Sequence, residues 1–164
     1  MELSAAQRER YERNLLVEGF TDRMQQALIA ARVAVVGAGG LGSAALNYLV
    51  AAGVGHLTLI ENDTVSLSNL QRQVLYTTAD MGRPKAEVAA MRLSRLNPGC
   101  DIRVVTDRLT AANAVGLLGG HDAVVDCTDN YDARYVIDDF CREAEVPMIY
   151  GTAEAVGGQV AVFH

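Results

Sequence analysis

Short apolar runs alternate with longer amphipathic stretches along most of the chain. Runs of small and β-branched residues predict strands at residues 33–36, 56–60, 102–105, 123–127, 148–150 and 159–163. Between them, apolar positions repeat with helical spacing, which predicts helices at residues 41–52, 85–96 and 130–144. Strands that alternate with helices pair in parallel through right-handed crossovers. The pattern therefore predicts an α/β fold, with a doubly wound, Rossmann-like, mostly parallel sheet and helices on both faces.

Two further helices are predicted before the first strand, at residues 5–15 and 23–31. We expect residues 1–31 to form an N-terminal helical segment and residues 32–164 to form the Rossmann-like unit, within a single domain. In the helix at residues 41–52, the spacing predicts one buried face. Its members are Leu41, Ala44, Ala45, Tyr48, Leu49 and Ala52.

Composition narrows the class of protein. The chain has 164 residues, half of them hydrophobic, which is enough for one substantial core. Its net charge of -6 argues against binding to nucleic acid or to an anionic membrane, since both favour clustered Lys and Arg. No leader or membrane-spanning run is visible, so we expect a cytoplasmic protein. The cysteines form no C-x-x-C pair, which predicts buried thiols and no zinc site in this chain; they are Cys100, Cys127 and Cys141.

A glycine-rich turn follows the first predicted strand. Gly37, Gly39 and Gly42 satisfy the pattern G-x-G-x-x-G at the start of a helix, where backbone N–H groups and the helix dipole favour phosphate. Glu61 ends the second strand, where an acidic side chain can accept hydrogen bonds from ribose hydroxyls. The turn predicts a nucleotide site, with close packing of the helix on the strand as the alternative.

The segment from about residue 61 to residue 83 has no strong periodicity, which is typical of a functional loop. It carries polar side chains suited to a polyphosphate, at Ser68, Asn69, Arg72 and Gln73. Lys85 follows at a predicted helix start, an unfavourable place for a cation unless a phosphate lies nearby. These groups favour ATP over a redox dinucleotide, although a solvated loop would also be polar.

Acidic and amide side chains follow the strand at residues 123–127. Asp126, Asp129 and Asn130 stand at its carboxyl end, where open α/β sheets bind ligands. Asp129 is placed to hold Mg²⁺. Capping of the next helix by Asp129 or Asn130 is the alternative, and both roles can coexist on adjacent residues.

The chain resembles the MoeB/ThiF/HesA family of adenylyltransferases, which is related to the activating enzymes of ubiquitin. The motifs that carry the resemblance stand in the family's order at residues 10–14, 36–42, 63–73, 82–85 and 126–130. Family members use MgATP to activate the C-terminal Gly-Gly carboxylate of a small ubiquitin-like carrier protein, forming an acyl-adenylate and pyrophosphate. The resemblance implies the same reaction, with ATP and Mg²⁺ as cofactors and a sulfur-carrier protein as partner.

The resemblance also assigns roles to residues. It implies catalytic roles for Asn69, Arg72, Lys85 and Asp129, with Mg²⁺ on Asp129, and for Arg13, which would reach the site of the partner subunit in a homodimer. It implies nucleotide contacts from Gly37, Gly39, Gly40, Gly42, Glu61, Asp63, Ser68, Gln73 and Asn130. The family commonly has Asp at the position of Glu61. Family members continue past the position of His164 with a crossover loop and zinc-binding cysteines, so this chain is expected to be a fragment or a short relative.

Three rival functions remain open at this stage. A NAD-dependent oxidoreductase domain shares the glycine turn but gives Asn69, Arg72 and Lys85 no role. A relative that activates a carboxylate on tRNA is disfavoured by the acidic composition. A catalytically incomplete nucleotide-binding module is the third.

Overall fold

The computed structural model describes residues 2–164 and contains one six-stranded sheet. Its strands are β1 (Arg32–Val36), β2 (His56–Ile60), β3 (Asp101–Val105), β4 (Ala123–Asp126), β5 (Met148–Glu154) and β6 (Gly157–Phe163). The order is β3-β2-β1-β4-β5-β6, with parallel pairing throughout except between β5 and β6. The prediction of a doubly wound, mostly parallel sheet is confirmed. The order reverses between β1 and β4, where such sheets bind ligands.

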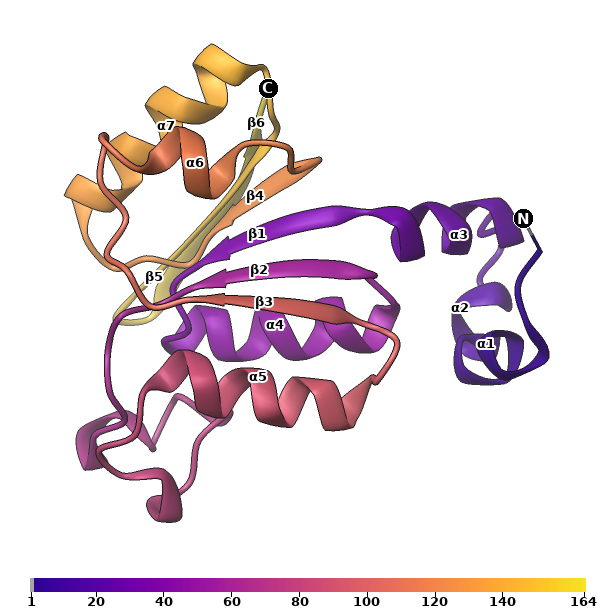
Figure 1. Ribbon diagram of the computed structural model, residues 1–164, viewed down its shortest axis with the longest axis horizontal. Coiled ribbons are helices and arrows are strands. Elements are labelled where there is room, and N and C mark those ends of the chain that lie inside the picture. The colour runs from indigo at the N-terminus through magenta and orange to yellow at the C-terminus, as the bar shows by residue number, and fades with distance from the viewer. Residues whose placement is uncertain (1) are drawn as a thin grey trace.

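Helices cover both faces of the sheet (Figure 1). The helices α4 (Gly40–Ala52) and α5 (Lys85–Leu96) lie on one face, and α6 (Ala114–Leu118) and α7 (Tyr131–Ala144) lie on the other. Alternate residues of β1 point to opposite faces, so Val35 joins the core under α4 and α5 while Val36 joins the core under α6 and α7. An all-apolar strand is required because both of its faces are buried.

The predicted buried face of α4 is wrong in part. The residues of α4 that are buried are Gly42, Ser43, Leu46 and Val50, whereas Tyr48 is 77% exposed. A Cβ atom on Gly42 would lie 2.1 Å from the carbonyl oxygen of Gly37, so the helix must turn this glycine toward the strand. That close approach sets the rotation of α4 about its axis, and the spacing of apolar residues does not reveal it.

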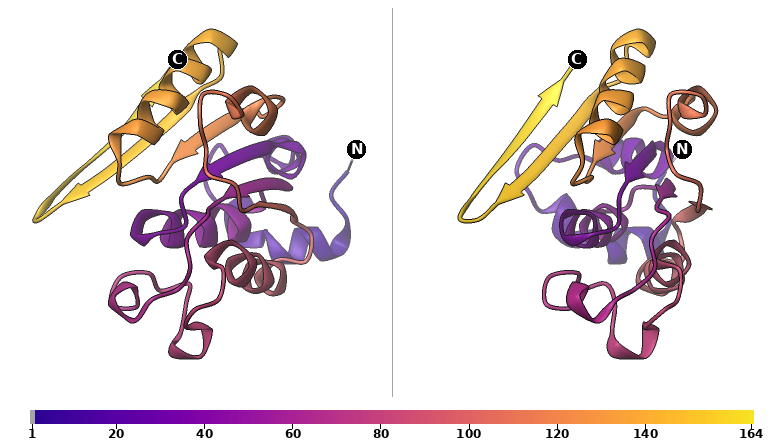
Figure 2. Two further views of the ribbon diagram at one scale, coloured as in Figure 1. Left: turned by 60° about the vertical axis from the view of Figure 1, so that its left-hand side comes forward. Right: turned by 90° about the vertical axis from the view of Figure 1, so that its left-hand side faces the viewer.

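Three local features differ from the sequence prediction. The helix expected at residues 5–15 is two helices, α1 (Ala5–Arg10) and α2 (Glu12–Leu15), which meet at Tyr11. The Tyr11 side chain is buried, and its hydroxyl accepts a hydrogen bond from Asn97. The helix α6 was not predicted, and β5 and β6 extend into a hairpin that projects at one edge of the sheet (Figure 2).

The N-terminal helices pack at the amino-terminal end of the sheet, against the last turns of α4 and α5 (Figure 1). The third of them, α3 (Asp22–Ala30), contributes Gln25, whose Nε2 donates to the carbonyl oxygen of Ala52 at 2.9 Å. Asn14 donates to the same oxygen at 3.2 Å. From α1, Arg10 donates to the carbonyl oxygen of Leu96, the last residue of α5, at 3.1 Å. These contacts join the N-terminal segment closely to the sheet unit. The division between the two at residue 31 stays a prediction.

The loop between β2 and α5 contains two short 3-10 helices, η1 (Leu67–Asn69) and η2 (Thr78–Asp80). Asp80 is buried and pairs with Arg92 of α5 and with Arg83. Burial raises the pKa of Asp80, but hydrogen bonds from Thr77 and the two guanidinium groups outweigh burial, so its pKa lies below the usual value. The pair holds the loop against α5.

Because the pKa of Asp80 is lowered in the folded protein, its contribution to stability is present above the unfolded pKa and is lost as the pH falls through the folded value. We expect Asp80→Asn to lower the free energy of unfolding by about 2 kcal/mol at pH 7. The difference from the wild type should shrink steadily below about pH 4. Urea unfolding of both proteins at pH 7, 5 and 3 measures it. An equal difference at all three pH values would contradict the assigned role.

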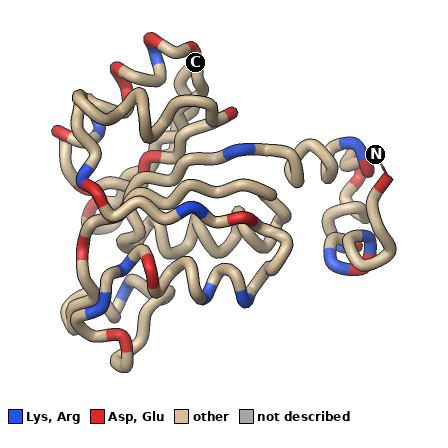
Figure 3. Tube along the Cα trace, in the orientation of Figure 1, with Lys and Arg blue, Asp and Glu red and all other residues tan. Residues whose placement is uncertain are grey.

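Charged residues of both signs are interspersed along the chain (Figure 3). Within residues 2–164, no helix has the length and apolar character that a membrane crossing needs.

Candidate functional site

A cavity of about 810 Å³ opens at the carboxyl ends of the strands, where the strand order reverses. Most of the predicted site residues line it, namely Gly37, Gly39, Gly40, Glu61, Asp63, Asn69, Arg72, Gln73, Lys85, Asp129 and Asn130. Gly42, Ser68 and Arg13 do not line it. The fold thus gathers residues from five separate segments of the sequence at one edge of the sheet.

The glycine turn allows close backbone packing and leaves backbone N–H groups open to the cavity. Gly37 has φ 93°, and a Cβ atom there would lie 2.8 Å from the carbonyl oxygen of Cys127, so only glycine suits this position. Gly42 packs α4 against the turn and faces away from the cavity. Gly40 begins α4 without a side-chain cap, which leaves its first N–H groups available to an anion. Close packing therefore accounts for Gly37 and Gly42, whereas phosphate binding at the start of α4 stays a prediction.

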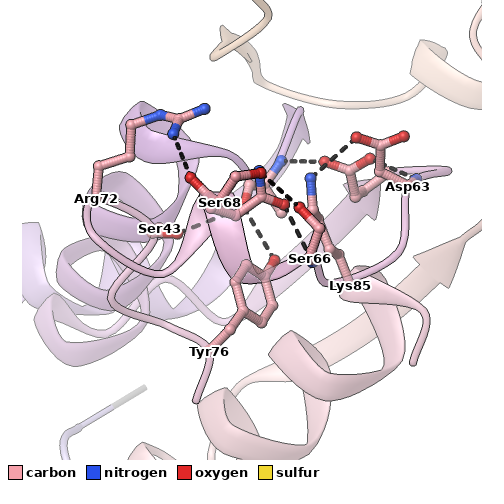
Figure 4. Close-up of polar contacts among 10 residues, drawn as sticks. Ser43, Asp63, Ser66, Ser68, Arg72, Tyr76 and Lys85 are labelled. Carbon is pink, nitrogen blue, oxygen red and sulfur yellow. Dashed lines mark hydrogen bonds and ion pairs between the residues drawn. The ribbon is translucent and has the colours of Figure 1, made fainter. Parts of the chain in front are cut away.

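Glu61 holds the glycine turn in place. One carboxylate oxygen accepts a hydrogen bond from the N–H of Ala38 at 2.8 Å, and the other accepts from the N–H of Asp63 at 2.8 Å. The carbonyl oxygen of Ala38 accepts from the hydroxyl of Tyr76 at 2.9 Å (Figure 4). Glu61 still lines the cavity, so the predicted ribose contact stays a prediction.

The polar loop is held mainly by its own hydrogen bonds (Figure 4). The N–H of Ser66 donates to the side chain of Asn69 at 3.3 Å, and Arg72 donates to the carbonyl oxygen of Ser68 at 3.2 Å. The stem of Arg72 lies beside Gly40, where an added Cβ atom would be 3.5 Å from its Cγ and Cδ atoms. The loop thus places a guanidinium next to the start of α4, while Ser68 faces the loop itself.

Gln73 is 3% exposed and lines the same cavity. Its side-chain oxygen is buried and has no hydrogen-bond partner among residues 2–164. A buried amide oxygen without a partner is costly, so a donor from a ligand would satisfy it. This observation fits a ligand that enters deep into the cavity.

Lys85, the only lysine in the sequence, is the first residue of α5. Its side chain is 4% exposed, and its ammonium lies 3.0 Å from the carboxylate of Asp63, whose side chain is 70% exposed. A cation at a helix N-terminus lacks support from the helix dipole. Because Asp63 can turn toward solvent, a phosphate could replace it as the partner of Lys85. The structure thus pairs a buried ammonium with a counterion that lies largely in solvent.

The end of β4 and the segment after it place two acidic side chains in different environments. Asp126 is fully buried, and one of its oxygens accepts from the N–H and the hydroxyl of Thr128 at 2.8 and 2.6 Å. Burial raises the pKa of Asp126 by more than Thr128 and Arg134 lower it. Asp129 is exposed at the cavity, and Asn130 caps α7 by accepting from the N–H of Ala133 at 2.9 Å. Capping therefore falls to Asn130 and leaves the Asp129 carboxylate available.

The donor set fits a magnesium ion that arrives with a nucleotide. Mg²⁺ is usually bound by one or two carboxylates together with substrate phosphates, and Asp129 supplies one carboxylate at the cavity. Over residues 2–164, no group of three or more His, Cys, Asp or Glu side chains is arranged around a common metal position.

The prediction of buried thiols is confirmed for Cys100, Cys127 and Cys141. Burial raises the pKa of Cys127 to about 12 and the pKa of each of the other two to about 11. These thiols are poor nucleophiles at neutral pH.

Sequence reasoning missed several cavity residues, among them Asp107, Arg108 and Arg134. Asp107 and Arg108 follow β3, and the rule that ligands bind at the carboxyl ends of strands could have found them. Arg134 lies in the first turns of α7, where its sequence position does not distinguish it from a surface arginine. Its contacts with Asp126, Thr128 and Tyr150 show that it lies largely buried against the site.

The model of the ThiF family matches residues 11–164. The chain belongs to the ThiF family. The molybdopterin-synthase adenylyltransferase of Salmonella typhimurium is 49% identical over 99% of the chain and 65% of that relative. The sulfur carrier protein adenylyltransferase of Thermus thermophilus is 47% identical over 95% of the chain and 58% of that relative. The chain thus spans less than two thirds of the length of either ThiF-family relative.

A solved ThiF-like structure contains the nucleotide that the site was predicted to bind. The E. coli tRNA N6-threonylcarbamoyladenosine dehydratase TcdA, crystallised in complex with ATP, superposes with a TM-score of 0.86 at 32% identity. The match covers 93% of this chain and 63% of that protein.

Proposed function

We propose that the protein is an ATP-dependent adenylyltransferase that activates the C-terminal Gly-Gly carboxylate of a small ubiquitin-like sulfur-carrier protein. The observation that carries the proposal is that Arg72 lies beside the open N-terminus of α4 and that Lys85 lines the same cavity, since a polyphosphate needs several cationic and N–H partners. The names of the two relatives support the reaction and the carrier class. The ATP complex of TcdA supports the nucleotide.

In the proposed reaction, a carboxylate oxygen of the carrier attacks the α-phosphorus of ATP. The bond from this phosphorus to the oxygen bridging to the β-phosphorus breaks, and the electron pair leaves with pyrophosphate. No proton is transferred, because the carboxylate is already ionised, so no side-chain base is needed. Arg72, Lys85 and Asn69 would hold the phosphates and stabilise the charge that develops. Magnesium, held by Asp129, would neutralise part of the phosphate charge.

Exchange of labelled pyrophosphate into ATP tests the proposal on the full-length protein. We expect exchange that requires Mg²⁺ and a carrier ending in Gly-Gly, and that is abolished when the carrier lacks its last glycine. No exchange with any such carrier, together with tight binding of NAD, would overturn the proposal in favour of an oxidoreductase domain.

A relative that acts on tRNA is the second candidate, because TcdA is named for a tRNA substrate. The interspersed charges and the net charge of -6 provide little for a phosphate backbone to bind. The identity to TcdA is also lower than the identity to the two carrier-activating relatives. Exchange stimulated by tRNA but by no carrier would favour this candidate. A module that binds nucleotide without catalysis would bind ATP and show no exchange with either.

We also propose that the protein works as a homodimer in the cytoplasm, the compartment in which unpaired thiols such as those found here stay reduced. Arg13 is exposed on α2, at the end of the molecule away from its own cavity (Figure 1). It could therefore act only at the cavity of a second subunit.

Mixing two inactive variants tests that placement of Arg13. Arg13→Ala and Asp129→Ala subunits should each show little exchange alone, whereas a mixture should recover up to about a quarter of the wild-type rate, because one of the two sites in half of the dimers is intact. Exchange that stays absent in dimers proven to be mixed would place Arg13 outside the site.

A further inference from the structure

Thr128, the residue before Asp129, has all of its polar groups held by one buried ion pair. Its N–H and its hydroxyl both donate to a carboxylate oxygen of Asp126, at 2.8 and 2.6 Å. Its carbonyl oxygen accepts from Nη2 of Arg134 at 2.8 Å. Thr128 is 8% exposed and Asp126 is fully buried. The peptide that leads into Asp129 is therefore fixed from both sides.

Arg134 joins three elements of the site. Beyond Thr128, its Nη1 donates to the hydroxyl of Tyr150 at 3.0 Å, and its guanidinium lies 4.9 Å from the centre of the Tyr150 ring. Its Nε lies 3.6 Å from the second carboxylate oxygen of Asp126, so the two are attracted as charges rather than joined by a hydrogen bond. The planar guanidinium reaches the segment after β4 and also β5 from α7, which a lysine ammonium could not do at once.

The residue after Asp129 is fixed as well. Asn130 accepts the N–H of Ala133 as the N-cap of α7. Asp129 is thus one residue between two immobilised neighbours, and its own side chain is exposed at the cavity. Magnesium requires nearly ideal octahedral geometry, so a small displacement of this carboxylate would weaken its contact with the metal.

We propose that Asp126 and Arg134 are positioning residues that set the location of the Asp129 carboxylate and thereby the affinity of the site for magnesium-bound nucleotide. The inference rests on the nucleotide site of the proposed function, but it does not require the carrier or the adenylation step. Burying the ion pair of Asp126 and Arg134 has a desolvation cost. A fixed position for the Asp129 carboxylate is the benefit that would offset this cost.

Binding of ATP to the full-length protein, with excess Mg²⁺ or with EDTA, tests the proposal by calorimetry. Arg134→Ala should weaken binding of MgATP by about 10-fold and binding of metal-free ATP by less than about 2-fold. In an Asp129→Ala background, the same change should weaken MgATP binding by less than about 2-fold, because residues that act through one group are not additive. Arg142→Ala, an exposed arginine of α7 paired with Asp139, is the matched control and should change neither constant.

An equal loss with and without magnesium, or an unreduced loss in the Asp129→Ala background, would overturn the proposal and leave Arg134 as a structural residue. If Arg134→Ala does not fold, as judged by its thermal transition, Arg134→Lys replaces it. The lysine variant keeps a positive charge near Asp126 but loses the fork, so it should weaken MgATP binding selectively, and unchanged binding would also overturn the proposal. If the wild-type protein binds MgATP but exchanges no pyrophosphate, the proposed reaction is wrong. The binding constants of the variants would still support or overturn the present inference.

Discussion

Lys85→Met is expected to lower the rate of ATP–pyrophosphate exchange by about 100-fold or more while the protein stays folded. The substitution keeps an unbranched apolar stem of similar length in the same buried position and removes only the ammonium. Lys85 is almost fully buried, and within residues 2–164 its charged partner is the exposed Asp63 alone. Its removal therefore takes away a preorganised charge in a region with little water, where such a charge acts most strongly on a phosphate.

Because Lys85 is the only lysine among residues 1–164, chemical modification provides a second measurement for this prediction. Among the side chains of residues 1–164, an amine-selective reagent can modify only Lys85, and bound MgATP should protect Lys85 from it, as measured by mass spectrometry of the peptide that contains it. Arg95→Met, an exposed position in the last turn of α5, is the control and should exchange at the wild-type rate. Wild-type exchange by folded Lys85→Met would show that Lys85 has no part in holding phosphate.

Gly42→Ala is expected to destabilise the protein by at least about 3 kcal/mol, or to prevent folding. The added Cβ atom would lie 2.1 Å from the carbonyl oxygen and 2.8 Å from the carbonyl carbon of Gly37. Backbone atoms cannot relieve the clash by changing rotamer, so α4 would have to move away from β1. That movement would open the glycine turn and separate Leu46 and Val50 from the core.

Gly116→Ala is the matched control, because Gly116 lies in α6 and an added Cβ atom there meets no atom within 4 Å. Alanine favours helix over glycine, so this variant should be as stable as the wild type or more stable by up to about 1 kcal/mol. Guanidinium unfolding of the three proteins measures both effects. A stable Gly42→Ala protein with normal ATP binding would contradict the packing role assigned to this glycine.

Much of the site could be predicted because each part of it carries a local signal. The glycine turn follows an apolar strand, and Asn69, Arg72 and Lys85 lie in and just after a segment that lacks periodicity. The strands that lead into these segments have their carboxyl ends brought together by any doubly wound sheet. The family motifs supplied Arg13, whose position on the first helices has no local signal of chemistry.

The sequence by itself determined the α/β class, the approximate positions of the strands and many of the residues that line the cavity, because burial on both faces, helical spacing and local motifs are properties of neighbouring residues. Only the tertiary structure decided the rotation of α4, the pairing of Lys85 with Asp63, and the hydrogen bonds that join Thr128 to Asp126 and Arg134. Each of these depends on how separate elements approach one another in space. Hydrophobic patterning indicates which elements are buried and their approximate buried faces, whereas steric contact and paired charge fix the final rotation and position of each element.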